Sequence, residues 1–500
     1  MLPLPIARTH LILSALCLLA VAGLAVRPSE AADWLRFRGP NGSGVADATG
    51  LPVDLGNEQN IAWKIPLPWG HSSPIISGNR IFLTAAEGGE AADAGRQKIV
   101  DSGGTLVTFA IDRGNGEILW KRVAPRPRME RYEKTNSPAS PSPVSDGENI
   151  YVFFGDFGLI SYTTEGDERW RLPVGPFNNV NGHGTSPILA GDKLILVCDS
   201  DTAPYMLAVN KDSGKIIWKA DRPETTRSYV TPALFQPEEG PLEVIVPSAY
   251  FLASYSVDTG EKLWWVNGGG WQPKSTPIIH GDMIYANSWE GGTSLPADAI
   301  PTFAEAIKKA DKNGDQKMDA EELKAVEPKR KLYLIDLNHD KLIDRRDWEF
   351  HRTRRTSKSS LLAVRHGGRG NLTETDNLVW SLERLLPNVP SPLIYEDVLY
   401  LIKDGGILST LNPTTGEVLK QGRLKNALDK YYSSPVGADG KIYMISQLGK
   451  ATVLKAGAQW DILATHDFGE EVYATPAIVD NRLYIRTRNA LYCFTQPAKP

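Results

Sequence analysis

Short apolar runs separated by polar turns recur from about residue 60 to residue 495 of this 500-residue chain. In one recurring step, a serine or threonine followed by proline leads into a run of apolar residues. The step begins at Ser73, Ser142, Ser186, Thr231, Thr276, Ser391, Ser434 and Thr475. Proline is tolerated at the start of a strand, because its missing N–H costs no ladder hydrogen bond there. The pattern therefore predicts eight copies of one β-sheet unit.

A second pattern predicts the outer hairpin of each unit. A small residue, an aspartate or asparagine, a turn glycine and a tryptophan follow one another at a fixed spacing. Small residue and tryptophan are Ala110 and Trp120, Ala208 and Trp218, and Ser254 and Trp264, with Lys420 replacing the tryptophan after Thr410. A large ring against a small residue can bury an aromatic surface between neighbouring sheets. Because an isolated sheet leaves both faces wet, we expect an all-β, eight-bladed β-propeller.

The two ends of the chain are expected to share one blade. The last unit, residues 475–494, has three strands and no tryptophan strand after it. Residues 60–63 match residues 377–380, which form the outer strand of the fifth unit. An N-terminal strand beside the last strand would close the ring and leave no exposed edge. Two stacked β-domains are the alternative, but they do not explain an orphan strand at each end.

These repeats resemble the pyrroloquinoline-quinone-like (PQQ-like) propeller family, which includes quinoprotein alcohol dehydrogenases and the BamB-type outer-membrane assembly protein. The resemblance covers roughly residues 60–495, and residues 33–42 are similar to the start of non-dehydrogenase members. For a dehydrogenase, the resemblance implies a quinone beside a vicinal Cys-Cys disulfide, a calcium ion and an aspartate base. The chain has no adjacent cysteines. We therefore expect a non-catalytic binding or assembly scaffold without bound PQQ; a PQQ-dependent dehydrogenase with a degenerate site is the alternative.

Residues 295–355 interrupt the fifth unit and differ in character from the rest of the chain. They are charged and helix-forming, and they contain two loops, at residues 311–322 and 336–347, with acids at alternate positions. Calcium requires six to eight hard oxygen ligands, and this spacing directs them inward around a tight loop. The candidate ligands are Asp311, Asn313, Asp315, Lys317, Asp319, Glu322, Asp336, Asn338, Asp340, Leu342, Asp344 and Asp347. The segment is thus predicted to be an EF-hand pair inserted in blade five; two solvated acidic loops are the alternative.

Both loops depart from the usual EF-hand pattern. The sixth position should be glycine, but Gln316 and Lys341 stand there, which implies a positive φ at residues that carry a Cβ. Asp347 ends the second loop, and its arm is shorter than the usual glutamate. Because extracellular modules bind calcium at about 10⁻⁴–10⁻³ M, we expect a structural clamp and not a signalling switch.

The N-terminus has the features of a signal peptide. Arg8 precedes an apolar run over residues 11–26, and small residues surround a cleavage site near Ala31. An uncleaved membrane anchor is the alternative. Cleavage would give a periplasmic or extracellular protein without an integral membrane domain, in which Cys198 and Cys493 are expected to be buried and unpaired. The expected organisation is a signal peptide (1–31), the closing strand and blades one to five (33–292), the EF-hand pair (295–355) and the remaining blades (357–495).

Residues just before the Ser/Thr-Pro steps are expected to face the central funnel, because the inner strands line it. These positions are polar or aromatic: His71, His183, Arg227, Tyr229, Trp271, Lys274, Tyr432 and Tyr473. Such a ring suits a peptide, a protein segment or a small anionic ligand; a hydrated channel is the alternative. The formal net charge of −4 gives no signal for nucleic-acid binding.

Overall fold

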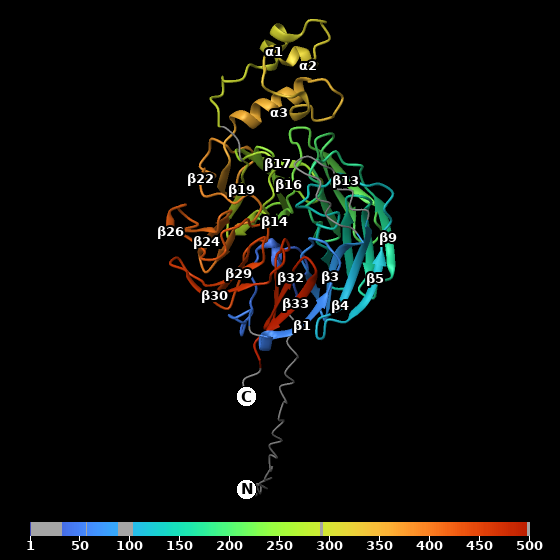
Figure 1. Cartoon of the computed structure of the whole chain (residues 1–500), viewed down its shortest axis with the longest axis vertical. Coiled ribbons are helices and arrows are strands. Elements are labelled where there is room, and N and C mark those ends of the chain that lie inside the picture. Colours follow the sequence, from blue (N-terminus) through green and yellow to red (C-terminus); the bar gives the residue numbers. More distant parts are fainter. Residues whose placement is uncertain (2–32, 57, 89–103, 291–293, 498–500) are drawn as a thin grey trace.

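The computed structural model describes residues 1, 33–56, 58–88, 104–290 and 294–497. Within this part of the chain, eight sheets are arranged around a central axis (Figure 1). The prediction of an all-β, eight-bladed propeller is confirmed. The predicted signal peptide, including Ala31, lies outside the described residues, and none of the described helices is long and apolar enough to cross a membrane.

The first four blades follow the chain in order, each with four antiparallel strands. Blade one contains β2 (Ile75–Ser77), β3 (Arg80–Glu87), β4 (Thr105–Asp112) and β5 (Ile118–Val123); blade two contains β6 (Val144–Ser145), β7 (Asn149–Phe154), β8 (Gly158–Thr163) and β9 (Glu168–Pro173); blade three contains β10 (Ile188–Ala190), β11 (Lys193–Cys198), β12 (Tyr205–Asn210) and β13 (Ile216–Asp221); blade four contains β14 (Ala233–Phe235), β15 (Glu243–Ser248), β16 (Phe251–Ser256) and β17 (Lys262–Asn267). A short strand, β21 (Gly370–Asn371), pairs in parallel with β17 and covers that edge.

The other four blades complete the ring. Blade five contains β18 (Ile278–His280), β19 (Met283–Ser288), β20 (Ser360–Arg365) and β22 (Leu378–Leu382); blade six contains β23 (Leu393–Tyr395), β24 (Val398–Lys403), β25 (Ile407–Leu411) and β26 (Val418–Arg423); blade seven contains β27 (Val436–Ala438), β28 (Lys441–Ile445), β29 (Lys450–Lys455) and β30 (Asp461–Asp467); blade eight contains β31 (Ala477–Val479), β32 (Arg482–Arg486), β33 (Ala490–Thr495) and β1 (Ile61–Pro66). In blade eight, β1 runs antiparallel to β33, with Trp63 opposite Cys493.

Tryptophan rings on the outer strands pack against turn glycines of the next blade. A Cβ added to Gly214 would lie 2.7 Å from the ring of Trp170, and one added to Gly260 would lie 2.7 Å from the ring of Trp218. Trp63 covers Gly116 in the same way, at 2.8 Å, so this contact also spans the junction between blades eight and one. The repeated glycine therefore serves both the turn, where φ is positive, and the seal between blades.

Three α-helices lie outside the ring at one end of the molecule (Figure 1). These are α1 (Phe303–Ala310), α2 (Ala320–Leu323) and α3 (Arg345–Thr356), and they all lie between β19 and β20 of blade five. Short 3-10 helices are η1 (Pro40–Gly42), η2 (Glu58–Asn60) and η3 (Leu332–Leu334). The helices enclose a small core of their own, in which Met318, Ile343 and Trp348 are fully buried.

Candidate functional site

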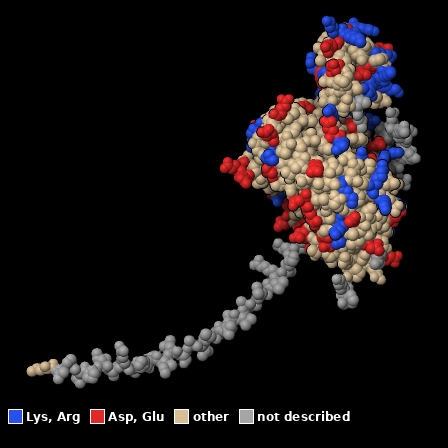
Figure 2. All heavy atoms as spheres, turned by 90° about the vertical axis from the view of Figure 1, so that its left-hand side faces the viewer, with Lys and Arg blue, Asp and Glu red and all other residues tan. Residues whose placement is uncertain are grey.

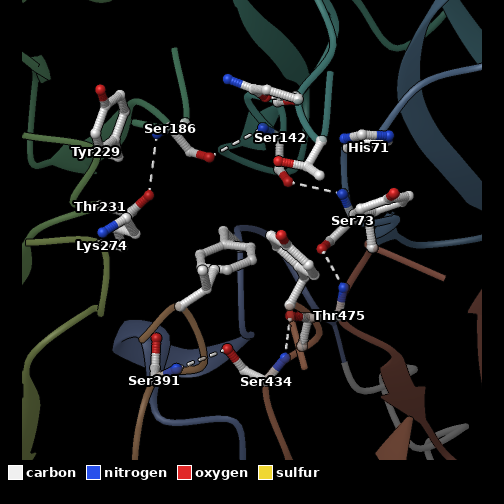
Figure 3. Close-up of a pocket in the computed structure, with 18 of the residues that line it drawn as sticks. His71, Ser73, Ser142, Ser186, Tyr229, Thr231, Lys274, Ser391, Ser434 and Thr475 are labelled. Atoms are coloured by element: carbon white, nitrogen blue, oxygen red, sulfur yellow. Dashed lines mark hydrogen bonds between the residues drawn. The ribbon is translucent and has the colours of Figure 1, made fainter. Parts of the chain in front are cut away.

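The Ser/Thr-Pro steps form a ring of hydrogen bonds around the axis. The backbone N–H of one step donates to the hydroxyl of another in seven bonds of 2.9–3.0 Å: Thr475 to Ser73, Ser73 to Ser142, Ser142 to Ser186, Ser186 to Thr231, Thr276 to Ser391, Ser391 to Ser434 and Ser434 to Thr475. Figure 3 draws all of them except the bond from Thr276. Between Thr231 and Thr276 no such bond is found, and the buried Thr276 hydroxyl has no partner among the described residues. The repeated hydroxyl therefore holds adjacent blades together.

The segment before β1 crosses this ring and closes one end of the channel. Trp34 pairs with Ile76 of blade one, and Arg36 donates to the carbonyl of Pro232 in blade four. Farther along, Arg38 reaches blades six and seven through hydrogen bonds to the carbonyls of Pro392 (2.8 Å) and Pro435 (3.2 Å). Residues 33–42, which in sequence resemble the start of non-dehydrogenase family members, thus form the floor of the axial channel.

An axial cavity of about 280 Å³ lies above this floor. Five of the predicted funnel residues line it: His71, Tyr229, Lys274, Tyr432 and Tyr473. The His71 ring stacks on Tyr473, with ring centres 4.0 Å apart. Burial, together with the charge of Arg486, holds the pKa of His71 well below its ordinary value, so this imidazole is neutral. One wall is therefore flat and aromatic.

Lys274 brings a positive charge into the axial cavity (Figure 3). Its Nζ donates to the backbone carbonyl of Gln272 (3.0 Å) and to Oδ1 of Asn388 (3.2 Å), which are both neutral acceptors. Burial lowers the pKa of Lys274 to about 8. A partly buried ammonium group with neutral acceptors favours an anion as its neighbour.

The other three predicted funnel residues do not line the axial cavity. His183 is buried, contacts Oε2 of Glu130 at 3.0 Å and packs edge-on against Phe177. Its imidazole is therefore a structural group that packs against the connection after β5, and the prediction that it lines the funnel is wrong. Arg227 and Trp271 line a different cavity, between the propeller and the helices. Periodicity places a residue near an inner strand, but it does not show which way the side chain turns.

Several residues of the axial cavity were missed by the sequence analysis. They are Phe37, Glu133, Thr135, Asn136, Asn181 and Asn388. The serines and threonines of the Ser/Thr-Pro steps also line the cavity. Phe37 comes from the segment that forms the floor, and Glu133, Thr135 and Asn136 come from the long connection between β5 and β6. No repeat includes these positions, because the long connections differ from blade to blade. The only signal was the extra length of the connection.

Trp271 is covered by two guanidinium groups. The Arg354 group lies 3.7 Å from the ring centre and that of Arg227 lies 4.5 Å from it. The ring is 5% exposed, and its Nε1 donates to the hydroxyl of Thr226 at 2.6 Å. Cation–π contacts of this kind orient both arginines. The Trp271 ring is therefore not available as a platform for a planar cofactor.

The first acidic loop, residues 311–322, has the backbone of a tight ligand-binding turn. The two carboxylate oxygens of Asp311 accept the N–H groups of Gly314 (2.7 Å) and Gln316 (3.0 Å). Gln316 has a φ of 62°, as the sixth position requires. At the end of the loop, Glu322 accepts the N–H of Lys312 at 2.9 Å. Both ends of the loop are thus drawn toward its centre.

The second acidic loop, residues 336–347, follows the same course. Asp336 Oδ2 accepts the N–H of Lys341 (2.9 Å), whose φ is 69°. A two-residue bridge joins the loops, since Met318 and Ile343 exchange backbone hydrogen bonds of 3.0 and 2.8 Å. Burial, with the charges of Asp344 and Asp336, raises the pKa of Asp347 to about 7. A bound cation would offset the repulsion between these neighbouring carboxylates.

The donor set of the second loop fits a hard cation. Asp336 is 4% exposed, and its Oδ1 has no hydrogen-bond partner among the described residues. A buried carboxylate oxygen without a partner is unusual, and a bound ion would satisfy it. In the described ranges, no three His, Cys, Asp or Glu side chains already converge on one point. Amide and backbone oxygens would therefore have to supply part of the ligand set, as they do in calcium loops of this length.

The second loop is also the point where the helices contact the propeller. Asn178 Nδ2 donates to the carbonyl of Leu337 at 2.6 Å, and Arg346 donates to the carbonyls of Asp201 (2.5 Å) and Thr225 (3.0 Å). The Leu337 side chain is buried in a cluster with Trp271. Figure 2 shows basic side chains spread over the outside of the helical insertion. The insertion is thus fixed to the ring through its second loop and α3.

The two cysteines of the described chain behave as predicted. Cys198 and Cys493 are buried, and neither takes part in a disulfide. Burial raises the pKa of the Cys493 thiol to about 11 and that of the Cys198 thiol still further above its ordinary value. Both are therefore unreactive packing residues.

A family profile matches the N-terminal half of the propeller. The profile of the family described as outer membrane protein assembly factor BamB matches residues 56–198 and 164–299. No curated protein matches the chain. BamB from Moraxella catarrhalis has a TM-score of 0.53 and 13% identity, over 88% of this chain and 98% of that chain.

Two dehydrogenases have similar scores. A europium-containing methanol dehydrogenase gives a TM-score of 0.56 at 9% identity, over 93% of this chain and 98% of its own. The quinohemoprotein alcohol dehydrogenase ADHIIG from Pseudomonas putida HK5 gives 0.56 at 10% identity, over 94% and 81%. At these identities the likeness concerns the fold alone. The chain is thus an eight-bladed propeller that matches the BamB family profile over residues 56–299 and is similar in fold to both BamB and the quinoprotein dehydrogenases.

Proposed function

We propose that this protein is an exported, non-catalytic binding or assembly scaffold, in which a propeller carries a ligand cavity and a calcium-binding EF-hand pair. The observation that carries the binding role is the axial cavity: its floor is closed by residues 33–42, and its cation, Lys274, contacts neutral acceptors. The family whose profile matches is described as an assembly factor, which supports a protein or peptide partner. A peptide carboxylate or another small anion would provide the missing negative charge.

The EF-hand interpretation is supported by the paired geometry of the two loops. Positive φ at Gln316 and Lys341, the bridge between Met318 and Ile343, and the unpartnered Asp336 Oδ1 all fit a pair of calcium loops. The ligands would be the twelve residues predicted from the sequence. Calcium would there supply positive charge that holds the loop oxygens together. The role is that of a structural clamp, because the second loop is fixed to the propeller wall.

Calcium is therefore expected to order the environment of Trp348. This tryptophan is fully buried in the core of the helical insertion, and its Nε1 donates to the carbonyl of Pro301 at 2.9 Å. Adding calcium to calcium-free protein should change the near-UV circular dichroism, with a midpoint of about 10⁻⁴–10⁻³ M. Trp348→Phe should remove most of this signal. Asp336→Ala should weaken the response, whereas Asp461→Ala, at an exposed site on β30, should leave it unchanged. A flat titration up to several times that range contradicts the calcium assignment.

The ammonium group of Lys274 gives a separate test of the axial cavity. Its pKa of about 8 means that the side chain loses its charge as the pH rises through 8. Affinity for an anion should therefore fall above this pH, and a bound anion should raise the pKa. After reductive methylation with ¹³C, one lysine resonance should titrate near pH 8, should be missing in Lys274→Arg and should move to higher pH with glutarate. A Lys274 resonance that titrates above pH 10 contradicts the anion-binding role.

The PQQ-dependent dehydrogenase is the alternative, and the geometry gives it less support. Arg354 and Arg227 cover the Trp271 ring, and the sequence offers no adjacent cysteines for a vicinal disulfide. These residues do not fit a stacked quinone. Adding PQQ with calcium and following a bound chromophore and dye reduction separates the two functions. A stoichiometric chromophore with turnover would establish the dehydrogenase instead.

A further inference from the structure

A second cavity, of about 550 Å³, lies where the helical insertion meets the propeller. We call it the junction cavity. The propeller contributes Arg131, Arg227 and Trp271 to its wall, and the insertion contributes His339 and Arg354. Glu133 and Asn181 line both this cavity and the axial cavity, so the two spaces are neighbours. One of its walls is the second acidic loop, through Asp336, Leu337 and His339.

The wall of the junction cavity contains a buried donor that lacks an acceptor. Arg227 is 7% exposed, and its Nε has no hydrogen-bond partner among the described residues. Asp201 lies on one side only, with Oδ2 3.1 Å from Nη1. Buried guanidinium donors are nearly always satisfied, because leaving one unpaired costs free energy. A ligand in the cavity that carries a hydrogen-bond acceptor would satisfy the Nε–H donor of Arg227.

Two further guanidinium groups favour an anion as the acceptor, in a cavity that Glu133, Asp201 and Asp336 also line. Arg131 is exposed at the rim. Arg354 is held by the Trp271 ring and by Glu290, 2.8 Å away. Planar guanidinium groups match the geometry of a carboxylate better than a lysine does. We propose that the junction cavity is a binding site for a carboxylate-bearing ligand, and that calcium in the second loop completes it.

The dependence on calcium follows from the charge of the wall. The second loop carries four carboxylates, those of Asp336, Asp340, Asp344 and Asp347. Without a cation they repel an incoming carboxylate, whereas one calcium ion adds two positive charges to the loop. The wall itself stays in place, because Asn178 and Arg346 hold it to the propeller. Calcium should therefore raise the affinity for the ligand without moving the insertion, and the ligand should raise the affinity for calcium to the same degree.

The test uses the full chain and two probes that carry the same chemistry. Glutarate represents a small dicarboxylate, and a tetrapeptide with a free carboxyl terminus represents a protein segment, with the amidated tetrapeptide as its control. Isothermal titration is done with about 5 mM free calcium, above the range of extracellular modules, and in calcium-free buffer. We expect at least one probe to bind, with an affinity at least fivefold higher in calcium, at the lower end of typical allosteric coupling.

Variants locate the probe. Arg227→Gln should weaken the binding of the probe at least tenfold. Because Arg227 is buried and its loss can disturb folding, Arg131→Gln, at the exposed rim, is the second variant and should weaken binding several-fold. Arg423→Gln, at an exposed site on β26, is the matched control and should bind as the parent does. If only Lys274→Gln weakens binding, the probe occupies the axial cavity and the inference is overturned.

The inference rests on calcium binding by the second loop, and the two can fail separately. A near-UV response to calcium, together with probe affinities that are equal with and without calcium, overturns the junction site alone. The same conclusion holds if neither probe binds. If calcium gives no near-UV response, the EF-hand assignment itself fails and the junction site fails with it.

Discussion

Replacing Arg38 by methionine is expected to lower the free energy of unfolding by about 3–5 kcal/mol, a loss comparable to breaking a buried ion pair. Arg38 is fully buried, and its guanidinium donates to the carbonyls of Gly42, Ser43, Pro392 and Pro435. Methionine has similar length but no donor. Each buried acceptor that remains unsatisfied costs about 1–3 kcal/mol, although such costs are not fully additive.

Urea unfolding, followed by tryptophan fluorescence, measures this loss. Arg423→Met is the matched control, because Arg423 is exposed on β26 and should change stability by no more than about 0.5 kcal/mol. Equal unfolding midpoints for the two variants would show that the floor segment, residues 33–42, does not hold the ring together.

Gly214→Ala and Gly191→Ala form a matched pair that isolates the seal between blades. Both glycines have a positive φ, 71° and 63°. A Cβ on Gly214 would lie 2.7 Å from the ring of Trp170, whereas one on Gly191 meets nothing within 4 Å. The backbone cost of about 1–2 kcal/mol is common to both. Gly214→Ala should lose about 1–3 kcal/mol more, because the ring must shift out of its contact.

The difference between the two glycine variants is the measured quantity, which removes the shared backbone cost. Thermal unfolding or urea midpoints are sufficient for it. A difference near zero would mean that the Trp170 ring adapts freely, and that the seal between blades does not depend on a close fit.

The propeller could be predicted from sequence because the same packing and hydrogen-bonding requirements recur in successive blades. A serine or threonine before proline is needed at seven of the eight steps, since its hydroxyl accepts the N–H of an adjacent step. Gly214 must be small because the Trp170 ring covers it. Each requirement occurs in several blades. The same residue types therefore recur at the same spacing, and the pattern can be recognised in one sequence without an alignment.

The sites could be predicted only in part, because their residues occur once each. Lys274 was found because it precedes a repeated step, and it does line the axial cavity. His183 precedes such a step as well, but its ring turns toward Glu130, which belongs to a long connection outside the repeat. Two of the four carbonyl partners of Arg38 lie more than 350 residues away, at Pro392 and Pro435. No local pattern records contacts of that kind.

The position of the helical insertion has a consequence for how such chains can be altered. Strands β19 and β20 are antiparallel neighbours, and their last paired residues are Ser288 and Ser360. Residues 289–359 therefore leave and re-enter the sheet at one point, where a short hairpin turn would also fit. The segment can therefore be exchanged as a unit: a turn in its place would preserve blade five, and another folded unit with closely spaced ends could be grafted there to give the ring a different accessory domain.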